Sequence, residues 1–367
     1  MNEFESGKVA GVAAGIVDRF ALPAPVDSVE PCGSGLINAT FLVTVEDARY
    51  ILQRVNDAVF PEPARIMSNL SVLAGHVAAH AESGLRIPAL IAARDGRSFV
   101  RDGQGGFWRL MEFIPNTRGL ARIDNLEQAR EVGRILGRFH ALVSDLPVDR
   151  LAVTLPGFHV TPGYLERFEQ VLAARTTVHP ATLSQAIACV TVQQAQVDVL
   201  EAARQGGYLP VRVIHGDPKL DNILFDRVVG RAVSLIDLDT VQAGLVHYDI
   251  GDCLRSCCCC GGGSAGTRFD LDLCRVILGA YANEIGDLLD MAEIELLFDA
   301  IRLIPFELAL RFLTDHLEGD HYFRVTERGQ NLHKAGIQLA LVGDIEGKER
   351  EIRAIVAACF RRGKIVP

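Results

Sequence analysis

The sequence predicts an α+β protein of two lobes, a small β-rich N-terminal lobe and a larger, mostly helical C-terminal lobe. Short alternating apolar runs separated by turn residues fill the first third of the chain, as is typical of strands. From Leu126 onward the apolar residues recur at helical spacing. The change falls near Phe113 to Arg118, where a predicted strand ends in Ile-Pro-Asn. We therefore expect lobes of residues 1–115 and 116–367.

The N-terminal lobe is expected to contain a sheet and one main helix. A short helix is predicted over residues 9–20, and strands with turns over residues 28–56. Pro61 and Pro63 open the main helix, which runs to about residue 82, because proline suits the first helical turn. A hairpin follows, formed by Phe99-Val100, a DGQGG turn and Phe107 to Ile114.

The C-terminal lobe is expected to be a set of helices interrupted once by strands, over residues 211–237. The helix after Leu126 has one apolar face, made of Val132, Ile135, Leu136, Phe139 and Val143. Further helices are predicted over residues 182–204 and over about 270–288, 293–317 and 326–342. Pro305 is expected to kink or divide the helix that contains it, because proline has no amide hydrogen to donate.

Composition and charge narrow the possible partners and compartment. The net charge of −9 argues against a nucleic-acid or anionic-membrane surface. No apolar run reaches the roughly 18 residues that cross a bilayer, and the acidic N-terminus is unlike a secretory signal. Four of nine cysteines are consecutive, Cys257 to Cys260, and no paired C-x-x-C spacing accompanies them, so free thiols are expected. We expect a cytoplasmic protein with no membrane or nucleic-acid partner, while the oligomeric state is not predicted.

The chemistry is concentrated in the segment His215-Gly216-Asp217-Pro218-Lys219-Leu220-Asp221-Asn222, which lies between two apolar runs. Asp237 ends the next apolar run, fifteen residues after Asn222. Phosphoryl transfer needs one carboxylate to orient the attacking hydroxyl and accept its proton, a role that suits Asp217. It also needs oxygen ligands for the Mg²⁺ that bridges the nucleotide phosphates, and Asn222 and Asp237 provide them. This spacing predicts an active site for phosphoryl transfer.

Three neighbouring residues are expected to support this site. His215 is predicted to bond to the backbone around the loop. Lys219 either lies near the phosphates or is a solvated lysine. Asp239 faces the same side as Asp237 and either supports the metal site or caps the loop. Asp249 and Asp252 precede a predicted helix and are expected to cap its N-terminus.

These segments resemble the aminoglycoside phosphotransferase and choline kinase family, which has a protein-kinase-like fold. The resemblance includes FWRLMEFI, LGRFH, HGDPKLDNILFD and LIDLDTVQAGL. Three further segments, GSGLINATF, YILQRVN and ALRFLTDHLEGDHYF, resemble the N-acetylhexosamine 1-kinases within that family. The resemblance implies a kinase that uses ATP and Mg²⁺ and a small-molecule hydroxyl acceptor. It also places Asp249 at a position that braces the catalytic loop. It favours a sugar, through the anomeric hydroxyl of an N-acetylhexosamine.

The nucleotide is expected to bind the N-terminal lobe at three places. Gly33, Ser34 and Gly35 form a turn that lets backbone N–H groups approach phosphate. Met111, Glu112 and Ile114 belong to a segment that resembles the kinase hinge, in which the backbone of Glu112 and Ile114 would bind adenine. Kinases place a lysine on the third strand, but Gln53 stands there, followed by Arg54. Either Arg54 reaches the phosphates or the nucleotide relies more on metal. The helix over 61–82 also lacks an obvious glutamate partner for such a lysine.

The acceptor site is predicted from four polar residues. Arg311 and Asp315 share a helix face, which is typical of an ion pair, while the resemblance places them in the acceptor pocket. Asn38 and Thr40 keep the glycine-rich segment polar, although Leu36 replaces the polar residue expected of a sugar kinase.

Two alternatives stay open. The acceptor is an amino alcohol, homoserine or an aminoglycoside, for which Asp315, Glu318 and Asp320 offer an acidic pocket. The other alternative is a nucleotide-binding pseudokinase or regulatory module, which the missing strand lysine favours. The presence of Asp217, Asn222 and Asp237 together argues against it.

Overall fold

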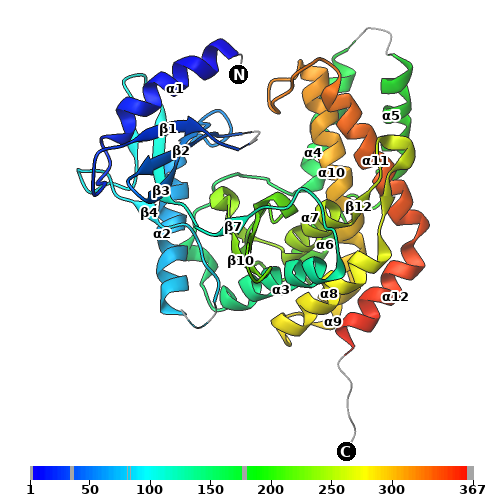
Figure 1. The fold of residues 1–367 in the computed structure, drawn as a ribbon. Coiled ribbons are helices and arrows are strands. Elements are labelled where there is room, and N and C mark those ends of the chain that lie inside the picture. The colour runs from blue at the N-terminus through cyan, green and yellow to red at the C-terminus, as the bar shows by residue number, and fades with distance from the viewer. Residues whose placement is uncertain (1–2, 34–36, 81, 83, 176–179, 362–367) are drawn as a thin grey trace, which may run out of the picture.

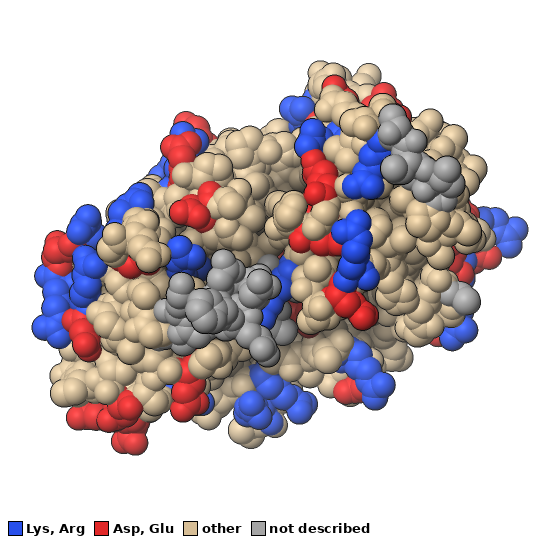
Figure 2. Space-filling model, turned by 90° about the horizontal axis from the view of Figure 1, so that it is seen from above, with Lys and Arg blue, Asp and Glu red and all other residues tan. Residues whose placement is uncertain are grey.

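The protein is described from a computed structural model, which covers residues 3–33, 37–80, 82, 84–175 and 180–361. The two predicted lobes are present, with the sheet of the first beside the helices of the second (Figure 1). Among the described residues, no helix is both long and apolar enough to cross a membrane. On the face seen in Figure 2, acidic and basic side chains are interspersed and do not gather by sign.

The N-terminal lobe is built on a six-stranded antiparallel sheet. Its strands are β1 (Ser28–Pro31), β2 (Ala39–Val45), β3 (Ala48–Val55), β4 (Leu90–Ile91), β5 (Val100–Arg101) and β6 (Phe107–Glu112). Their order is β1-β2-β3-β6-β4, with β5 also paired to β6. The alternation of buried and less buried residues along β2 fits a sheet with two different faces.

The helix α1 (Glu3–Val17) covers one face of this sheet (Figure 1). Apolar residues of α1 and the sheet form a core of their own, which includes Ile16, Phe20, Val43, Leu52 and Trp108. The helix begins and ends earlier than the predicted range 9–20. It stops before Phe20, because that residue pairs with Ala93 in a β-bridge.

The helix α2 (Pro63–Ala79) lies against the other face and joins the core of the C-terminal lobe. Its buried residues include Ile66, Met67, Leu70, Leu73 and Val77. The side-chain amide of Asn69 donates hydrogen bonds to the carbonyls of Ala152 and Val241, at 2.8 and 2.9 Å. The two lobes are therefore joined through α2 by both apolar packing and hydrogen bonds.

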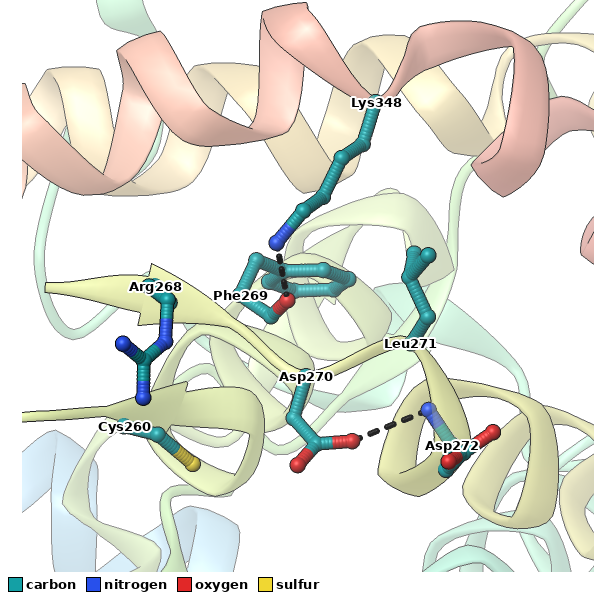
Figure 3. A pocket seen from close by; sticks show the side chains of 7 residues that line it. All are labelled: Cys260, Arg268, Phe269, Asp270, Leu271, Asp272 and Lys348. Carbon is teal, nitrogen blue, oxygen red and sulfur yellow. Dashed lines mark hydrogen bonds between the residues drawn. The ribbon is translucent and has the colours of Figure 1, made fainter.

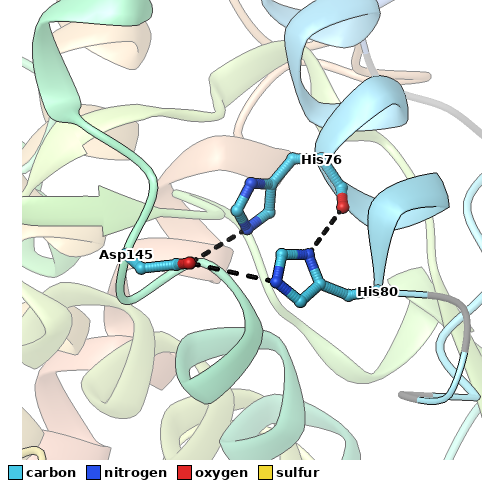
Figure 4. A group of neighbouring side chains, drawn as sticks. All are labelled: His76, His80 and Asp145. Carbon is cyan, nitrogen blue, oxygen red and sulfur yellow. Dashed lines mark hydrogen bonds and ion pairs between the residues drawn. The ribbon is translucent and has the colours of Figure 1, made fainter.

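Two histidines near the end of α2 add a polar contact between the lobes (Figure 4). His76 Nε2 lies 2.8 Å from the carbonyl of Leu142 and 3.2 Å from Asp145 Oδ1. Since a carbonyl only accepts, His76 is the donor of that bond and its Nε2 carries the proton. His80 Nε2 is 3.9 Å from Asp145 Oδ2. This cluster therefore ties α2 to the segment that follows α3.

The C-terminal lobe contains ten helices within the described residues. They are α3 (Leu126–Leu142), α4 (Thr161–Ala173), α5 (Ala181–Gln193), α6 (Val199–Gln205), α7 (Val246–Cys258), α8 (Leu271–Ile285), α9 (Met291–Glu295), α10 (Leu297–Glu318), α11 (Gln330–Gly347) and α12 (Glu349–Phe360). Asn125 caps α3 by accepting a hydrogen bond from the backbone of Gln128. Gly133 lets α3 approach α8, because a Cβ there would lie 2.0 Å from the carbonyl oxygen of Ile277.

The strands of this lobe are short. They are β7 (Thr117–Arg118), β8 (Arg212–Ile214), β9 (Ile223–Asp226), β10 (Ala232–Leu235), β11 (Gln242–Gly244), β12 (Cys259–Cys260) and β13 (Arg268–Phe269). Strand β7 pairs with β9, so the chain has already entered the second lobe at Thr117. All nine cysteines are free thiols.

Two sequence-based predictions about helices were wrong, and a third was wrong in part. The predicted helix over 182–204 is divided into α5 and α6, because Arg302 donates to the carbonyls of Gln193, Ala195 and Gln196 and so supports the break. Of the kink or division predicted at Pro305, the division does not occur, since α10 continues through that residue. Asp249 and Asp252 lie inside α7 and do not cap it.

A surface pocket of about 280 Å³ lies at the N-terminus of α8 (Figure 3). Its lining residues are Cys260, Arg268, Phe269, Asp270, Leu271, Asp272 and Lys348. Two of these are held by local contacts: Asp270 caps α8, and Lys348 donates to the carbonyl of Phe269 at 2.8 Å. None of the predicted site residues lines this pocket, so its position does not explain the phosphoryl-transfer motif.

Candidate active site

The backbone places Asp217 at the end of β8 through a turn that requires glycine. Gly216 has φ of +87°, and a Cβ there would lie 2.7 Å from the carbonyl oxygen of Thr240. The hydroxyl of Thr240 donates to the carbonyl of His215 at 2.8 Å. The close approach of these two segments leaves no room for a side chain at Gly216 and aligns Asp217 with the segment that carries Asp237.

Asp217, Asn222 and Asp237 lie close to one another. Asn222 Nδ2 donates to the carbonyl and to Oδ2 of Asp217, at 2.8 and 3.1 Å. The backbone N–H of Ile236 donates to the carbonyl of Asn222 at 2.9 Å, which holds the end of β10 beside the loop. The carboxyl of Asp237 interacts electrostatically with Asp217. Since the amide nitrogen of Asn222 is used, its oxygen is the atom left for a cation.

The buried carboxylate of Asp249 fixes the backbone at the start of the catalytic loop. Asp249 accepts hydrogen bonds from the backbone N–H groups of His215 and Gly216, at 2.7 and 2.8 Å. His140 Nε2 donates to the same carboxylate at 2.9 Å. Asp249 is fully buried, so these donors replace the water that the charge has lost.

His215 links the two halves of the site. Its Nδ1 accepts from the backbone N–H of Asp217 at 3.2 Å, and its Nε2 donates to the carbonyl of Ile236 at 3.1 Å. Burial lowers the pKa of His215, which keeps the ring neutral. A neutral ring with one donor and one acceptor nitrogen matches these two bonds.

Lys219 is ion-paired and is not a solvated lysine. Its ammonium contacts Asp217 Oδ2 directly. Burial would lower the pKa of Lys219, but the charges of Asp217 and Asp237 raise it overall. The lysine is therefore charged at neutral pH and lies among the carboxylates where phosphate is expected.

Asp237 has an unusual backbone and an unusual carboxyl. Its φ is +62°, in the left-handed region, which aspartate tolerates better than most residues. Asp237 is exposed as a whole residue, yet the protein atoms around its carboxyl group partly desolvate that group. This desolvation, followed by the negative charge of Asp239, raises the pKa of Asp237 to about 6. Hard oxygen donors in this arrangement fit Mg²⁺.

A functional residue that the sequence analysis missed is Arg109 on β6. It is 1% exposed and lies directly across the sheet from Gln53. Its Nε and Nη2 donate to Gln53 Oε1 at 3.0 and 2.6 Å, and its Nη1 lies 2.5 Å from Asp239 Oδ1. An arginine within the apolar run Phe107-Trp108-Arg109-Leu110 was the signal available in the sequence.

The prediction that Arg54 reaches the phosphates was wrong. Arg54 lies across from Trp108, which belongs to the core under α1, so it faces away from the C-terminal lobe. It pairs with Asp102 at 3.9 Å. Gln53, by contrast, points to the face that holds Arg109.

The remaining nucleotide-binding predictions concern the hinge and the glycine-rich turn. The N–H of Glu112 donates to the carbonyl of Ala89, so Glu112 can offer adenine only its carbonyl. The N–H that donates to adenine would then belong to another residue, such as Ile114. Met111, in the same segment, is half-buried. Gly33 has a positive φ of +78°, while Ser34 and Gly35 lie outside the described residues.

Asn38 and Thr40 join the network around Arg109. Asn38 Nδ2 donates to Asp239 Oδ2 at 2.8 Å, and Gln53 Nε2 donates to Thr40 Oγ1 at 3.0 Å. These contacts place both residues beside Gln53 and Asp239, and their assignment to the acceptor site stays a prediction. Asp239 itself is buried between Arg109 and Asn38.

Arg311 lies in a box of aromatic rings. Its guanidinium carbon is 5.2–5.7 Å from the ring centres of Phe158, Tyr164, Tyr322 and Phe323. It pairs with Glu307, four residues earlier in α10, at 3.7 Å. Burial would lower the pKa of Arg311, but Tyr164, Tyr322 and Glu307 raise it overall.

Asp315 has a structural role, which corrects its prediction as an acceptor ligand. Its Oδ1 accepts from the backbone of His321 and Tyr322, and its Oδ2 from the backbone of Phe323 and from Asn331. Four donors fill the acceptor capacity of a carboxylate. Asp315 therefore fixes the loop after α10, which carries Tyr322 to the aromatic box.

His159 connects this box to the catalytic loop. Its Nδ1 donates to Glu307 at 3.2 Å and its Nε2 donates to the carbonyl of Gly216 at 2.7 Å. Both ring nitrogens donate only in the protonated form. Burial would lower the pKa of His159, but the charge of Glu307 and these hydrogen bonds raise it overall.

Asp252 and Arg255 on α7 were also missed as site residues. Asp252 Oδ1 accepts from Arg255 Nε and Nη2 at 2.8 and 2.7 Å. Asp252 Oδ2 is buried and has no hydrogen-bond partner among the described residues. The negative charge of Asp252 interacts electrostatically with both Lys219 and His159. Asp252 therefore lies between the catalytic loop and the aromatic box.

Comparison with known proteins identifies the class. Residues 28–275 match the family model described as the phosphotransferase enzyme family. The chain belongs to this family, and it is a small-molecule phosphotransferase with a two-lobed kinase-like fold. The predicted aminoglycoside phosphotransferase and choline kinase relationship is thereby confirmed, whereas a sugar specificity is not.

Three similar proteins are instructive. A homoserine kinase from Methylobacterium radiotolerans is 27% identical over 302 residues, which are 79% of this chain and 80% of that protein. The structure of a microcompartment-associated aminopropanol kinase has a TM-score of 0.65 at 18% identity, covering 94% of this chain and 98% of that one. An amicoumacin kinase in complex with AMP-PNP and Ca²⁺ has a TM-score of 0.59 at 15% identity, covering 93% and 96%.

Proposed function

We propose that this protein transfers the γ-phosphate of ATP to the hydroxyl of a small molecule that also carries an amino group, such as an amino alcohol or homoserine. The proximity of Asp217, Asn222 and Asp237 to one another carries the phosphoryl-transfer part of the proposal. Each of these side chains has a defined task in phosphoryl transfer.

Asp217 accepts a hydrogen bond from the acceptor hydroxyl, aims it at the γ-phosphorus and takes its proton. Asn222 Oδ1 and the Asp237 carboxylate hold Mg²⁺, which when bound neutralises charge on the nucleotide phosphates. Lys219, already among these carboxylates, exchanges Asp217 for a phosphate oxygen. Transfer is direct, and catalysis rests on positioning and charge.

An amino group on the acceptor suits the charges beyond Asp217. Asp252 Oδ2 is a buried carboxylate oxygen without a partner among the described residues, and an ammonium group supplies the missing donor. Glu307 adds a second negative charge, and Arg311 offers a cation to a carboxylate such as that of homoserine. The names of the homoserine kinase and aminopropanol kinase relatives support the same class.

The N-acetylhexosamine that the sequence resemblance favours is the second candidate. The rings around Arg311 offer a stacking surface for a sugar, and Arg311 offers donors for its hydroxyl and N-acetyl oxygens. None of the three relatives described above is named as an N-acetylhexosamine kinase, so this acceptor ranks below the amino alcohols.

A coupled assay of ATP consumption tests the proposal. The acceptors are homoserine, aminopropanol, choline, N-acetylhexosamines and an aminoglycoside, each with Mg²⁺. We expect turnover with an amino-bearing acceptor. Turnover with N-acetylhexosamines alone assigns the second candidate, and nucleotide binding without any turnover assigns a pseudokinase. Removal of Mg²⁺ with a chelator is expected to abolish turnover.

A further inference from the structure

We propose that Arg109, held by Gln53 and paired with Asp239, supplies the positive charge that contacts the nucleotide phosphates in place of a lysine on β3. Asp239 then takes the place of the glutamate that the helix α2 lacks. The inference rests on the proposed use of ATP, but not on the identity of the acceptor. It accounts for both departures from the kinase pattern with one pair of residues.

The sheet register places Arg109 on the correct face. Residues directly opposite in an antiparallel pair point to the same side of the sheet. Gln53 stands at the position of the kinase lysine, and Arg109 is its direct partner across β3 and β6. The neighbouring pair, Arg54 and Trp108, points to the opposite side, toward the core under α1. Arg49 on β3 shares the face of Gln53, but it lies four residues away with its guanidinium 4.1 Å from the Phe113 ring centre. Arg109 is therefore the cation of β3 and β6 that lies directly beside Gln53.

The contacts of Arg109 resemble those that arginine makes with an anion. Its Nε and Nη2 both donate to one oxygen, Gln53 Oε1, at 3.0 and 2.6 Å. This forked arrangement is the one that arginine uses for carboxylate and phosphate. Gln53 is half-buried, so its side chain can leave the fork when a phosphate oxygen enters. Gln53 is thus a positioning residue that occupies the fork in the absence of nucleotide.

The pairing of Arg109 with Asp239 is incomplete. The two charged atoms Arg109 Nη1 and Asp239 Oδ1 are 2.5 Å apart, yet neither has an aligned hydrogen bond among the described residues. Both side chains are almost fully buried. A buried donor without an aligned acceptor is unfavourable, so a further oxygen beside Nη1 is stabilising. The positive charge of Arg109 also interacts electrostatically with the carboxyl of Asp237, the proposed metal ligand.

A purely structural role for Arg109 is the competing explanation, in which it only neutralises Asp239. The double variant Arg109→Gln/Asp239→Asn separates the two roles, because it removes both charges and leaves no buried carboxylate unpaired. Binding of ATP with Mg²⁺ and binding of adenosine are measured by calorimetry, and folding by thermal melting. Adenosine lacks phosphates and reports only on the hinge.

We expect the double variant to fold, to bind adenosine as the wild type does, and to bind ATP at least about tenfold more weakly, as for the loss of a hydrogen bond to a charged group. Adding Gln53→Lys to it is expected to recover part of the ATP affinity. An ATP affinity within about threefold of the wild type, below one hydrogen bond to a charged group, overturns the inference.

A second variant keeps the inference testable where the double variant does not fold. Gln53→Glu leaves the buried pair intact and fills the fork of Arg109 with a carboxylate, which competes with phosphate. The expected result is weaker binding of ATP with unchanged binding of adenosine, and equal ATP binding overturns the inference. A wild-type protein that binds no ATP overturns the proposed function itself, which is a different outcome.

Discussion

The catalytic loop and the aromatic box around Arg311 hold their polar side chains in different ways. In the loop, the buried carboxylate of Asp249 accepts backbone N–H groups at 2.7 and 2.8 Å, and His215 bonds to backbone on both sides. In the aromatic box, Arg311 is surrounded by rings at 5.2–5.7 Å, pairs with Glu307 at 3.7 Å and donates to the hydroxyl of Tyr322 at 3.4 Å.

This difference implies that the two regions tolerate amino-acid substitution to different extents. Hydrogen bonds to backbone fix the chain and therefore the position of Asp217, whatever the acceptor is. The contacts between the aromatic rings and the Arg311 guanidinium, by contrast, are made by side chains alone. We infer that the loop determines the reaction and that the aromatic box determines which molecule is phosphorylated. The following variants test that division.

The largest effect is expected from Asp217→Asn. The variant keeps the shape of the side chain but cannot take the proton, so kcat is expected to fall about 10²–10⁴-fold, while ATP affinity stays near that of the wild type. Steady-state kinetics and calorimetry measure the two quantities. Asp221→Asn, in the same loop and exposed, is the matched control. A kcat of Asp217→Asn equal to that of this control would remove Asp217 from the mechanism.

The next largest effect is expected on stability. Asp249→Ala leaves His140 and the backbone N–H groups of His215 and Gly216 buried without their acceptor. The free energy of unfolding is expected to fall by about 3–5 kcal/mol, as measured by urea denaturation. Asp272→Ala, at an exposed carboxylate, is expected to change it by less than about 0.5 kcal/mol. Equal stability of the two variants contradicts the bracing role of Asp249.

A smaller effect, confined to the acceptor, is expected from Arg311→Gln. The KM for the acceptor is expected to rise about tenfold or more, as for a lost hydrogen bond to a charged group. The KM for ATP and the melting temperature are expected to change little. Arg350→Gln, on the exposed face of α12, is the control. A rise in the KM for ATP, with the KM for the acceptor unchanged, would contradict a role of Arg311 in acceptor binding.

The smallest effect is expected from pH. Burial lowers the pKa of His247, whose Nε2 donates to the carbonyl of Glu293 at 2.8 Å. Its pKa in the folded protein thus lies below the unfolded value of about 6.5. The unfolded chain then binds the extra proton, so this histidine's stabilisation is present above about pH 6.5 and is lost as the pH falls.

Urea denaturation at several pH values between 7.5 and 5 measures this contribution. His247→Gln is expected to reduce the decrease in stability on acidification, whereas His333→Gln, at an exposed position, leaves it unchanged. An identical pH dependence in His247→Gln and the wild type disproves the contribution of His247.

Local patterns predicted the strands, the catalytic segment and the two lobes, because alternation and motif spacing act over a few residues. Contacts between residues far apart in the sequence could not be predicted from such local patterns. The break between α5 and α6 depends on Arg302 from α10, and the role of Arg109 depends on Asp239 from the other lobe. Helical spacing allowed an ion pair between Arg311 and Asp315, but Arg311 pairs with Glu307 and Asp315 binds the loop after α10, which spacing within one helix does not reveal.

The central claim is that Asp217 prepares a hydroxyl of a small amino-bearing molecule for attack on ATP. Phosphorus NMR of a reaction with ATP, Mg²⁺ and either homoserine or aminopropanol tests it most directly. We predict a new phosphate ester on the acceptor hydroxyl with the wild type and none with Asp217→Asn. Consumption of ATP that yields only inorganic phosphate, or an ester that forms equally well without Asp217, would contradict it.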